Sequence, residues 1–151
     1  MKKVLFVCLG NICRSPLGEA VFNYKASALD MDADSAGTAA YHVGENPDHR
    51  SIEVARKHGV PISHKAQKFV AEDFDRFDYV IAMDEQNYND MKALANGSTE
   101  HLYLLREFDP DSNGDLNVPD PYYGGIDGFE KVFQMVSRSV DGLINHIQSK
   151  K

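Results

Sequence analysis

VLFVCLGNICRSP, at residues 4–16, is the stretch of sequence that decides the fold. It begins with four apolar residues typical of a buried strand and continues through Cys8 and a glycine-containing turn to Arg14. Pro16 follows, and proline is favoured in the first turn of a helix. A strand, a tight loop and a helix in succession aim backbone N–H groups at one point, which is how proteins bind dianions. The stretch therefore predicts an α/β fold with an anion loop at residues 8–14.

The residue types in the anion loop point to phosphoryl transfer. Positive surroundings at a helix start favour the thiolate form of a cysteine, and a thiolate can attack phosphorus directly. The planar fork of Arg14 can hold two phosphate oxygens at once. Ser15 can donate a hydrogen bond to the Cys8 sulfur, and we expect Gly10 to supply a positive φ. A Cys-x5-Arg spacing is weak by itself, but its place between a strand and a helix makes it informative.

A candidate general acid lies far down the chain, in the segment VPDPYYGG at 118–125. Asp120 stands between two prolines, which hold it in a stiff, non-helical loop. Such an acid can protonate the leaving oxygen of a phosphate ester and then activate water. Tyr122 and Tyr123 would supply flat walls for an aromatic leaving group. An aspartate between prolines is more often a turn residue, so this role depends on its pairing with Cys8.

Further motifs lie in order along the chain: DSAGT at 34–38, DHR at 48–50, HKA at 64–66, FDY at 77–79 leading to MD at 83–84, and DPYYG at 120–124. With the loop at 7–16, they make the chain resemble the low-molecular-weight protein tyrosine phosphatases nearly end to end. The resemblance implies that Cys8 is the nucleophile, Arg14 the phosphate clamp and Asp120 the general acid and base, with no metal and no cofactor. It also implies supporting roles for the loop residues and their neighbours: Leu9, Gly10, Asn11, Ile12, Cys13, Ser15, Ser35 and His64. Without the family, Ser35 would be a strand-end hydroxyl and His64 an ordinary surface histidine.

Two positions vary within the family pattern. The chain has Gln67 where relatives often carry arginine, which affects one surface contact and leaves the catalytic set unchanged. Tyr41 stands where relatives carry tryptophan or another aromatic residue, and we expect it to line the substrate cleft with Tyr122 and Tyr123.

Other activities on the same fold are alternatives. Phosphoarginine phosphatases of this family carry threonine where this chain has Ile12, so the bulkier apolar side chain favours an aryl phosphate. Arsenate reductases of this fold need cysteines downstream, and none follows Cys13. A module that only binds phosphotyrosine would have lost Cys8 or Asp120, and both are present.

Cys13 raises a hypothesis of redox control. It lies five residues from Cys8 in the same loop, so after peroxide oxidises Cys8 it could close a reversible disulfide onto it. The alternative is that Cys13 is a small buried hydrophobic residue.

Composition agrees with a small enzyme. The chain has 151 residues, two cysteines and a formal charge of −7, which predicts one domain over 1–151, a reducing, cytoplasmic location and no nucleic-acid partner. The apolar run after Met1-Lys2-Lys3 breaks at Gly10 and lacks a cleavage site, so we interpret it as a strand rather than a signal peptide. No segment approaches the length of a membrane span, so no membrane contact is expected. We expect a phosphotyrosine-containing protein as substrate and a monomer that self-associates weakly at most.

Strand and helix patterns alternate, which predicts a single-domain three-layer α/β/α sandwich with a doubly wound, four-stranded parallel sheet. The expected strands are 3–7, 31–36, 79–83 and 101–105, and the expected helices are 16–28, 48–57 and 85–95. The last helix has the clearest period, with apolar residues on one face from Phe129 to Ile147.

An acidic loop at 109–120 resembles a calcium loop. Asp109, Asp111, Asn113, Gly114 and Asp120 match positions 1, 3, 5, 6 and 12 of that pattern. The last position is aspartate rather than glutamate, and the prolines around it forbid the exiting helix. We therefore interpret the segment as a solvated acidic turn.

Overall fold

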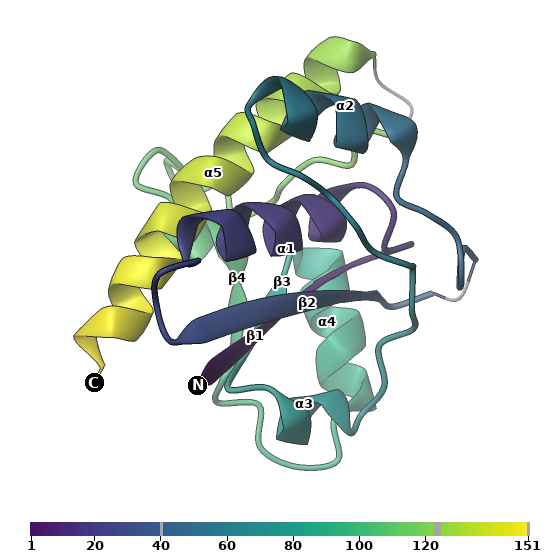
Figure 1. Cartoon of the computed structure of the whole chain (residues 1–151). Helices are drawn as coiled ribbons and strands as arrows, with labels where there is room; N and C mark the ends of the chain where they lie inside the picture. The colour runs from purple at the N-terminus through teal and green to yellow at the C-terminus, as the bar shows by residue number, and fades with distance from the viewer. Residues whose placement is uncertain (40, 123–124, 151) are drawn as a thin grey trace.

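A parallel sheet of four strands lies at the centre of the molecule, in the order β2-β1-β3-β4. The computed structural model describes residues 1–39, 41–122 and 125–150. The strands are β1 (Lys2–Cys8), β2 (Met31–Gly37), β3 (Tyr79–Ala82) and β4 (Leu102–Leu104). The predicted three-layer, doubly wound fold is confirmed, because helices cover both faces of the sheet (Figure 1).

The apolar start of β1 explains its central place. Val4 and Phe6 belong to the core on one face of the sheet, and Leu5 and Val7 belong to the core on the other. All four are buried, as is usual for an inner strand of a parallel sheet, which is covered on both sides. β1 pairs with β2 on one side and with β3 on the other.

Three helices lie on one face and two on the other (Figure 1). The first face carries α1 (Arg14–Lys25), α2 (His49–Lys57) and α5 (Ile126–Ser149), and the second carries α3 (Asp73–Arg76) and α4 (Glu85–Leu94). The predicted apolar stripe of α5 is confirmed, since Phe129, Val136 and Ile147 are among its buried residues.

Two short elements were not predicted. The strand expected at 101–105 is shorter, because the chain turns into the 3-10 helix η1 (Leu105–Phe108), where the Glu107 carboxylate accepts a hydrogen bond from the Leu104 N–H. The single-turn helix α3 is fixed in a similar way by Asp73, whose carboxylate accepts from the Val70 N–H. α1 begins two residues earlier than expected and ends at Lys25 rather than Ala28.

The acidic loop at 109–120 is not arranged for calcium. The Asp109 side chain is fully buried and bonds to Arg106 and Arg138, at 3.2 Å in each case. Asp120 lies near Arg14 instead, at the other end of the loop. The Asp109 carboxylate is thus already paired with two arginine side chains, which supports the interpretation that the segment is not a calcium loop.

The topology places a switch point between β1 and β3, because the chain leaves β1 toward β2 and later returns to the other side of β1. Ligands of doubly wound sheets bind beyond the carboxyl ends of the strands at such a point. The anion loop follows β1 and Asp84 follows β3 there. No helix in the described part of the chain is long and apolar enough to cross a membrane.

Candidate active site

A cleft of about 360 Å³ opens at the switch point. Its walls bring together three groups predicted from distant parts of the sequence, namely Cys8, Arg14 and Asp120. The remaining lining residues are Leu9, Gly10, Ile12, Cys13, Tyr41, His42 and Tyr122. His42 was not predicted. Tyr123 lies outside the described residues, so its predicted place in the cleft is not described.

The backbone of the anion loop departs from expectation in one respect. The positive φ is at Asn11, at 57°, and not at Gly10. Asparagine tolerates this left-handed conformation better than most residues, because its short polar side chain bonds locally. A Cβ at Gly10 would lie 3.0 Å from the His42 ring, so glycine leaves room for that side chain.

The N–H groups of the anion loop indicate a site for an anionic ligand. In the part of the chain that the structure describes, the N–H groups of residues 9–13 donate to no protein acceptor. Some of its carbonyls are engaged instead, since Leu9 O accepts from the Ala39 N–H and Ile12 O accepts from the Asp48 N–H. Buried backbone donors nearly always find a partner, so this row of N–H groups beside Cys8 suits the oxygens of a phosphate group.

The Cys8 sulfur is held by Ser15. Its Sγ lies 3.0 Å from Ser15 Oγ, which accepts a hydrogen bond of 2.7 Å from the side-chain amide of Asn11. Because the amide hydrogen occupies one lone pair of Ser15 Oγ, the hydroxyl hydrogen is available to the Cys8 sulfur at 3.0 Å or to the Ala36 carbonyl at 3.4 Å. The contact predicted between Ser15 and Cys8 is present.

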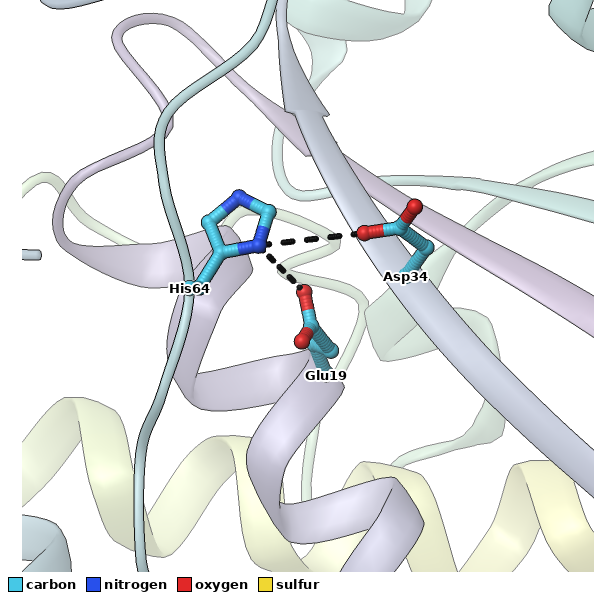
Figure 2. A group of neighbouring side chains, drawn as sticks. All are labelled: Glu19, Asp34 and His64. Atoms are coloured by element: carbon cyan, nitrogen blue, oxygen red, sulfur yellow. Dashed lines mark ion pairs between the residues drawn. The ribbon is translucent and has the colours of Figure 1, made fainter. Parts of the chain in front are cut away.

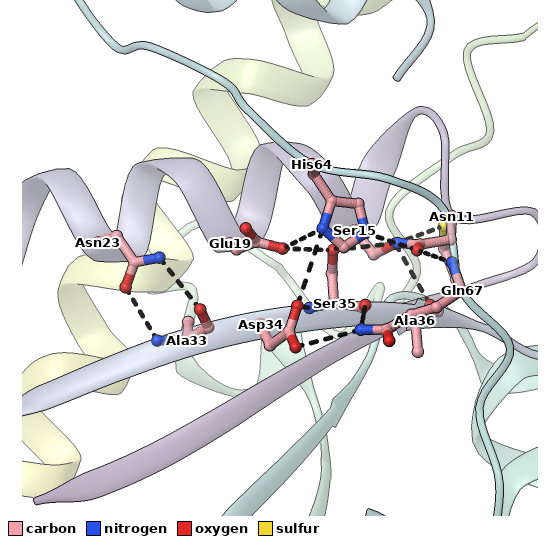
Figure 3. A network of polar contacts seen from close by, with 11 residues as sticks. Asn11, Ser15, Glu19, Asn23, Ala33, Asp34, Ser35, Ala36, His64 and Gln67 are labelled. Carbon is pink, nitrogen blue, oxygen red and sulfur yellow. Dashed lines mark hydrogen bonds and ion pairs between the residues drawn. The ribbon is translucent and has the colours of Figure 1, made fainter. Parts of the chain in front are cut away.

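Asn11 is the centre of a buried polar network (Figure 3). Its Nδ2 donates to Ser15 Oγ at 2.7 Å and to Ser35 Oγ at 3.0 Å. Its Oδ1 accepts from the Gln67 N–H at 2.9 Å and lies 2.7 Å from His64 Nε2. Because Oδ1 accepts from the Gln67 N–H, the amide oxygen faces His64, whose Nε2 donates to it when that nitrogen carries a hydrogen. Ser35 and His64 thus both contact Asn11 of the anion loop.

Glu19 completes this network and was missed from the sequence. Its carboxylate accepts from the Ser35 hydroxyl at 2.7 Å and lies 3.1 Å from His64 Nδ1. Asp34 lies 3.8 Å from the same ring nitrogen (Figure 2). A glutamate in the second turn of a helix gives no local signal, so only the fold reveals its partner.

Glu19, Asp34 and His64 also offer donor atoms within 4.8 Å of one another, the spacing of a metal site. Each of these atoms already serves the network: His64 Nδ1 pairs with Glu19, Glu19 Oε1 accepts from Ser35, and Asp34 Oδ1 accepts from the Ser35 N–H. The arrangement is fully explained as support for the anion loop.

The Arg14 side chain is buried, with 4% of its area exposed. One guanidinium nitrogen donates to Asp84 at 2.6 Å and to the Val118 carbonyl at 2.9 Å, and the other lies 3.9 Å from Asp120. Burial acts to lower the pKa of Arg14, but Cys8, Asp84 and Asp120 outweigh it, so the pKa is raised and the side chain stays charged. Asp84 also caps α4 through the Asn87 N–H, so a helix start helps to orient the Arg14 side chain. The sequence offered Asp84 only as part of a motif, with no role.

Asp120 and Tyr122 form the opposite wall of the cleft. The Asp120 carboxylate accepts from the Tyr122 N–H at 3.0 Å and is 43% exposed. Upstream, the Val118 N–H donates to the Met83 carbonyl, which ties the segment to the end of β3. Tyr41 lies at the rim, 74% exposed. The segment that carries Asp120, residues 118–122, is called the acid loop below.

Cys13 lines the cleft as a buried free thiol, and Cys8 is also a free thiol. Burial, followed by the charges of Asp48 and Cys8, strongly raises the pKa of Cys13. Cys13 is therefore protonated at neutral pH.

Comparison with known proteins agrees with this geometry. The family model described as low molecular weight phosphotyrosine protein phosphatase matches residues 3–151. A low molecular weight protein-tyrosine-phosphatase of Streptomyces coelicolor is 41% identical over 98% of this chain and 94% of that protein. A protein tyrosine phosphatase of Entamoeba histolytica superposes with a TM-score of 0.94 at 34% identity, over 99% of both chains. An arginine phosphatase of Drosophila superposes with a TM-score of 0.90 at 31% identity, over the full length of both chains.

The relatives that the chain matches are named as phosphatases, which agrees with a doubly wound parallel sheet that places a cysteine and an arginine around an anion loop. The chain belongs to the low molecular weight phosphotyrosine protein phosphatase family, and it is a hydrolase.

Proposed function

We propose that the protein hydrolyses phosphotyrosine in proteins through a phosphocysteine intermediate, with Cys8 as nucleophile, Arg14 as phosphate clamp and Asp120 as general acid and base. The observation that carries the proposal is the row of N–H groups at residues 9–13, which find no acceptor among the described residues and belong to a loop that lines the same cleft as these three side chains. Residues 1–151 would act as one domain.

In the first step, the Cys8 thiolate attacks phosphorus while the bond to the tyrosine oxygen breaks. Asp120 gives its proton to that oxygen, so the leaving group departs as a neutral phenol. The loop N–H groups and Arg14 hold the three equatorial oxygens and stabilise their charge. Ser15 donates to sulfur and stabilises the thiolate before attack and after release.

In the second step, water attacks the phosphocysteine. Asp120, now a carboxylate, takes a proton from the water as the sulfur–phosphorus bond breaks. Inorganic phosphate and the Cys8 thiolate are the products, and Asp120 is again protonated. The balance needs no metal or redox partner.

Apolar and aromatic residues of the cleft favour an aryl phosphate. Ile12 lies in the wall of the cleft, with Tyr41 and Tyr122 at its exposed rim. Phosphoarginine is the second candidate substrate, because the Drosophila arginine phosphatase shares the fold over its full length. Arsenate reduction stays the least favoured alternative.

The proposal extends to the cellular setting. We propose a cytoplasmic enzyme that binds a phosphotyrosine-containing protein, acts as a monomer and binds neither nucleic acid nor membrane. The free state of both cysteines is what a reducing compartment would give.

The test is steady-state hydrolysis of a phosphotyrosine peptide and of phosphoarginine, in EDTA, by the wild type, Cys8→Ser and Asp120→Asn. We expect turnover of phosphotyrosine that is abolished by Cys8→Ser and falls about 100-fold or more with Asp120→Asn. Preference for phosphoarginine would keep the mechanism and overturn the substrate. Activity that survives Cys8→Ser would refute the mechanism.

A further inference from the structure

Arg50 lies between the anion loop and the acid loop, and the proposed mechanism gives it no role. It is the second residue of α2, and its side chain is about three-quarters buried. Its guanidinium donates to the carbonyl of Tyr122 at 3.0 Å, across 72 residues of sequence. Tyr122 is also the residue whose N–H donates to the Asp120 carboxylate. Arg50 therefore contacts the peptide segment that orients the general acid.

The guanidinium of Arg50 is fixed on its other sides. Its Nε and one terminal nitrogen donate to the two oxygens of Asp48, at 3.0 and 2.9 Å. Its central carbon lies 4.5 Å from the centre of the Phe129 ring and 5.7 Å from that of Tyr122, both within cation–π range. The hydrogen bond from Arg50 lowers the pKa of Asp48, so both partners are charged at neutral pH. A side chain held at this many points has one geometry.

Asp48 and its neighbour connect this cluster to the anion loop. The backbone N–H of Asp48 donates to the Ile12 carbonyl at 2.8 Å. One turn along α2, the Ser51 hydroxyl donates to the Cys13 carbonyl at 3.2 Å. The start of α2 is thus bonded to the loop that holds phosphate, and Arg50 extends from it to the loop that holds the acid.

We propose that Arg50 is a positioning residue that couples the anion loop to the acid loop and sets Asp120 at the leaving oxygen. The inference rests on the proposed role of Asp120. Arg50 is not among the described residues that line the cleft. It acts through Asp48 on one side and the Tyr122 peptide on the other.

Only arginine can fill this role. A bidentate contact to a carboxylate and a further donor to a carbonyl need a planar fork, which lysine lacks. A displacement of about 1 Å in a catalytic group can reduce the rate about 100-fold. Loss of the fork should therefore impair proton donation and leave phosphate binding intact.

The test compares aryl phosphates whose leaving groups need protonation to different degrees. Phenyl phosphate has a poor leaving group and depends on the acid, whereas 2,4-dinitrophenyl phosphate has a good one and does not. For Arg50→Lys we expect kcat/KM to fall about 10- to 100-fold with phenyl phosphate and less than about three-fold with dinitrophenyl phosphate. The inhibition constant of inorganic phosphate should stay within about two-fold of the wild type, since the anion loop is unchanged.

Arg56→Ala is the matched control, because Arg56 is an exposed arginine on the same helix, away from the cleft. It should leave both substrates unaffected. Arg50→Ala tests full removal of the side chain, and urea unfolding checks that each variant folds. Arg50→Lys keeps the charge and most of the length of the side chain, so it still tests the proposal if Arg50→Ala does not fold.

Asp120→Asn separates the inference from the function on which it rests. Suppose that Asp120→Asn shows the steep dependence on the leaving group. If Arg50→Lys then lowers kcat/KM equally for both substrates, or also weakens the binding of inorganic phosphate, the positioning role is wrong and the proposed function stands. If Asp120→Asn itself lowers kcat/KM equally for both substrates, the role of Asp120 as acid is refuted, and the role of Arg50 is refuted with it.

Discussion

The Asn11 amide makes four hydrogen bonds while its backbone holds a positive φ, and two substitutions separate these contributions. Asn11→Gly removes the side-chain amide and introduces a residue that adopts a φ of 57° without strain. Asn11→Ala removes the same amide and adds backbone strain. In most places alanine is the less damaging replacement, so the order of the two variants tests the interpretation directly.

The magnitudes follow from the contacts. The four bonds join Asn11 to Ser15, Ser35, His64 and Gln67 at 2.7 to 3.0 Å. At about 1 kcal/mol net for each bond, both variants should lose about 4 kcal/mol of unfolding free energy. The left-handed conformation costs an alanine roughly 1–2 kcal/mol, so Asn11→Ala should be the less stable of the two by about that amount.

Urea unfolding followed by circular dichroism measures the stability of both variants, and kcat/KM for a phosphotyrosine peptide measures the site. We expect activity to fall about 10-fold or more in both, because the anion loop loses the amide that joins Ser15, the neighbour of the Cys8 sulfur, to Ser35 and His64. If Asn11→Ala proves more stable than Asn11→Gly, the argument from φ is wrong. If either variant keeps wild-type activity, the network does not hold the anion loop.

Three further predictions concern other parts of the molecule. Gly37→Ala would place a Cβ 2.8 Å from a carbonyl oxygen of the anion loop, so it should lower stability by about 1–3 kcal/mol in urea unfolding and reduce kcat/KM, whereas an unchanged enzyme would contradict the tight packing. Burial acts to raise the pKa of Asp109, but hydrogen bonds from two arginines and a backbone N–H outweigh burial and hold this pKa below its usual value. Its stabilisation is thus present above the unfolded pKa of about 3.9 and is lost as the pH falls through the folded pKa, so Asp109→Asn should cost about 3 kcal/mol at pH 7 and less in acid, and a pH-independent difference would be evidence against this account. Mild peroxide should convert Cys8 to a sulfenic acid that condenses with the Cys13 thiol, releasing water and leaving a disulfide two hydrogens lighter by mass spectrometry; activity should return with a thiol reductant in the wild type but less completely in Cys13→Ala.

The parts predicted from the sequence are those whose signal is local. The apolar run of β1, the long stripe of α5 and the spacing of Cys8 and Arg14 each lie within one element or one loop. Their physical cause is periodicity and short-range geometry, which a sequence displays directly. The alternation of strands and helices then predicts the parallel sheet, and the sheet predicts where the anion loop must lie.

The parts missed depend on contacts between distant segments. Asp84 reaches Arg14 across 70 residues, and Arg50 reaches the acid loop across 72. Glu19 looks like any exposed helix residue until the fold brings His64 beside it. The positive φ was assigned to Gly10 because glycine adopts it at least cost, but the buried amide contacts of Asn11 supply more free energy than the strain removes.

The two halves of the cleft differ in burial, and the difference fits a substrate that is itself a protein. Arg14, Asn11 and Ser15 are almost fully buried, so the site for the phosphate is preorganised and its charges act in a medium of low dielectric constant. Asp120 and Tyr122 are exposed, and under the proposed function the protein chain of the substrate, which cannot enter the cleft, would lie on their side. Val118 and Pro121 anchor the acid loop in the interior, but the exposed Asp120 and Tyr122 have less packing around them, so their geometry depends on a few specific contacts. The hydrogen bond from Arg50 is one of these, and it joins the exposed half of the cleft to the buried half.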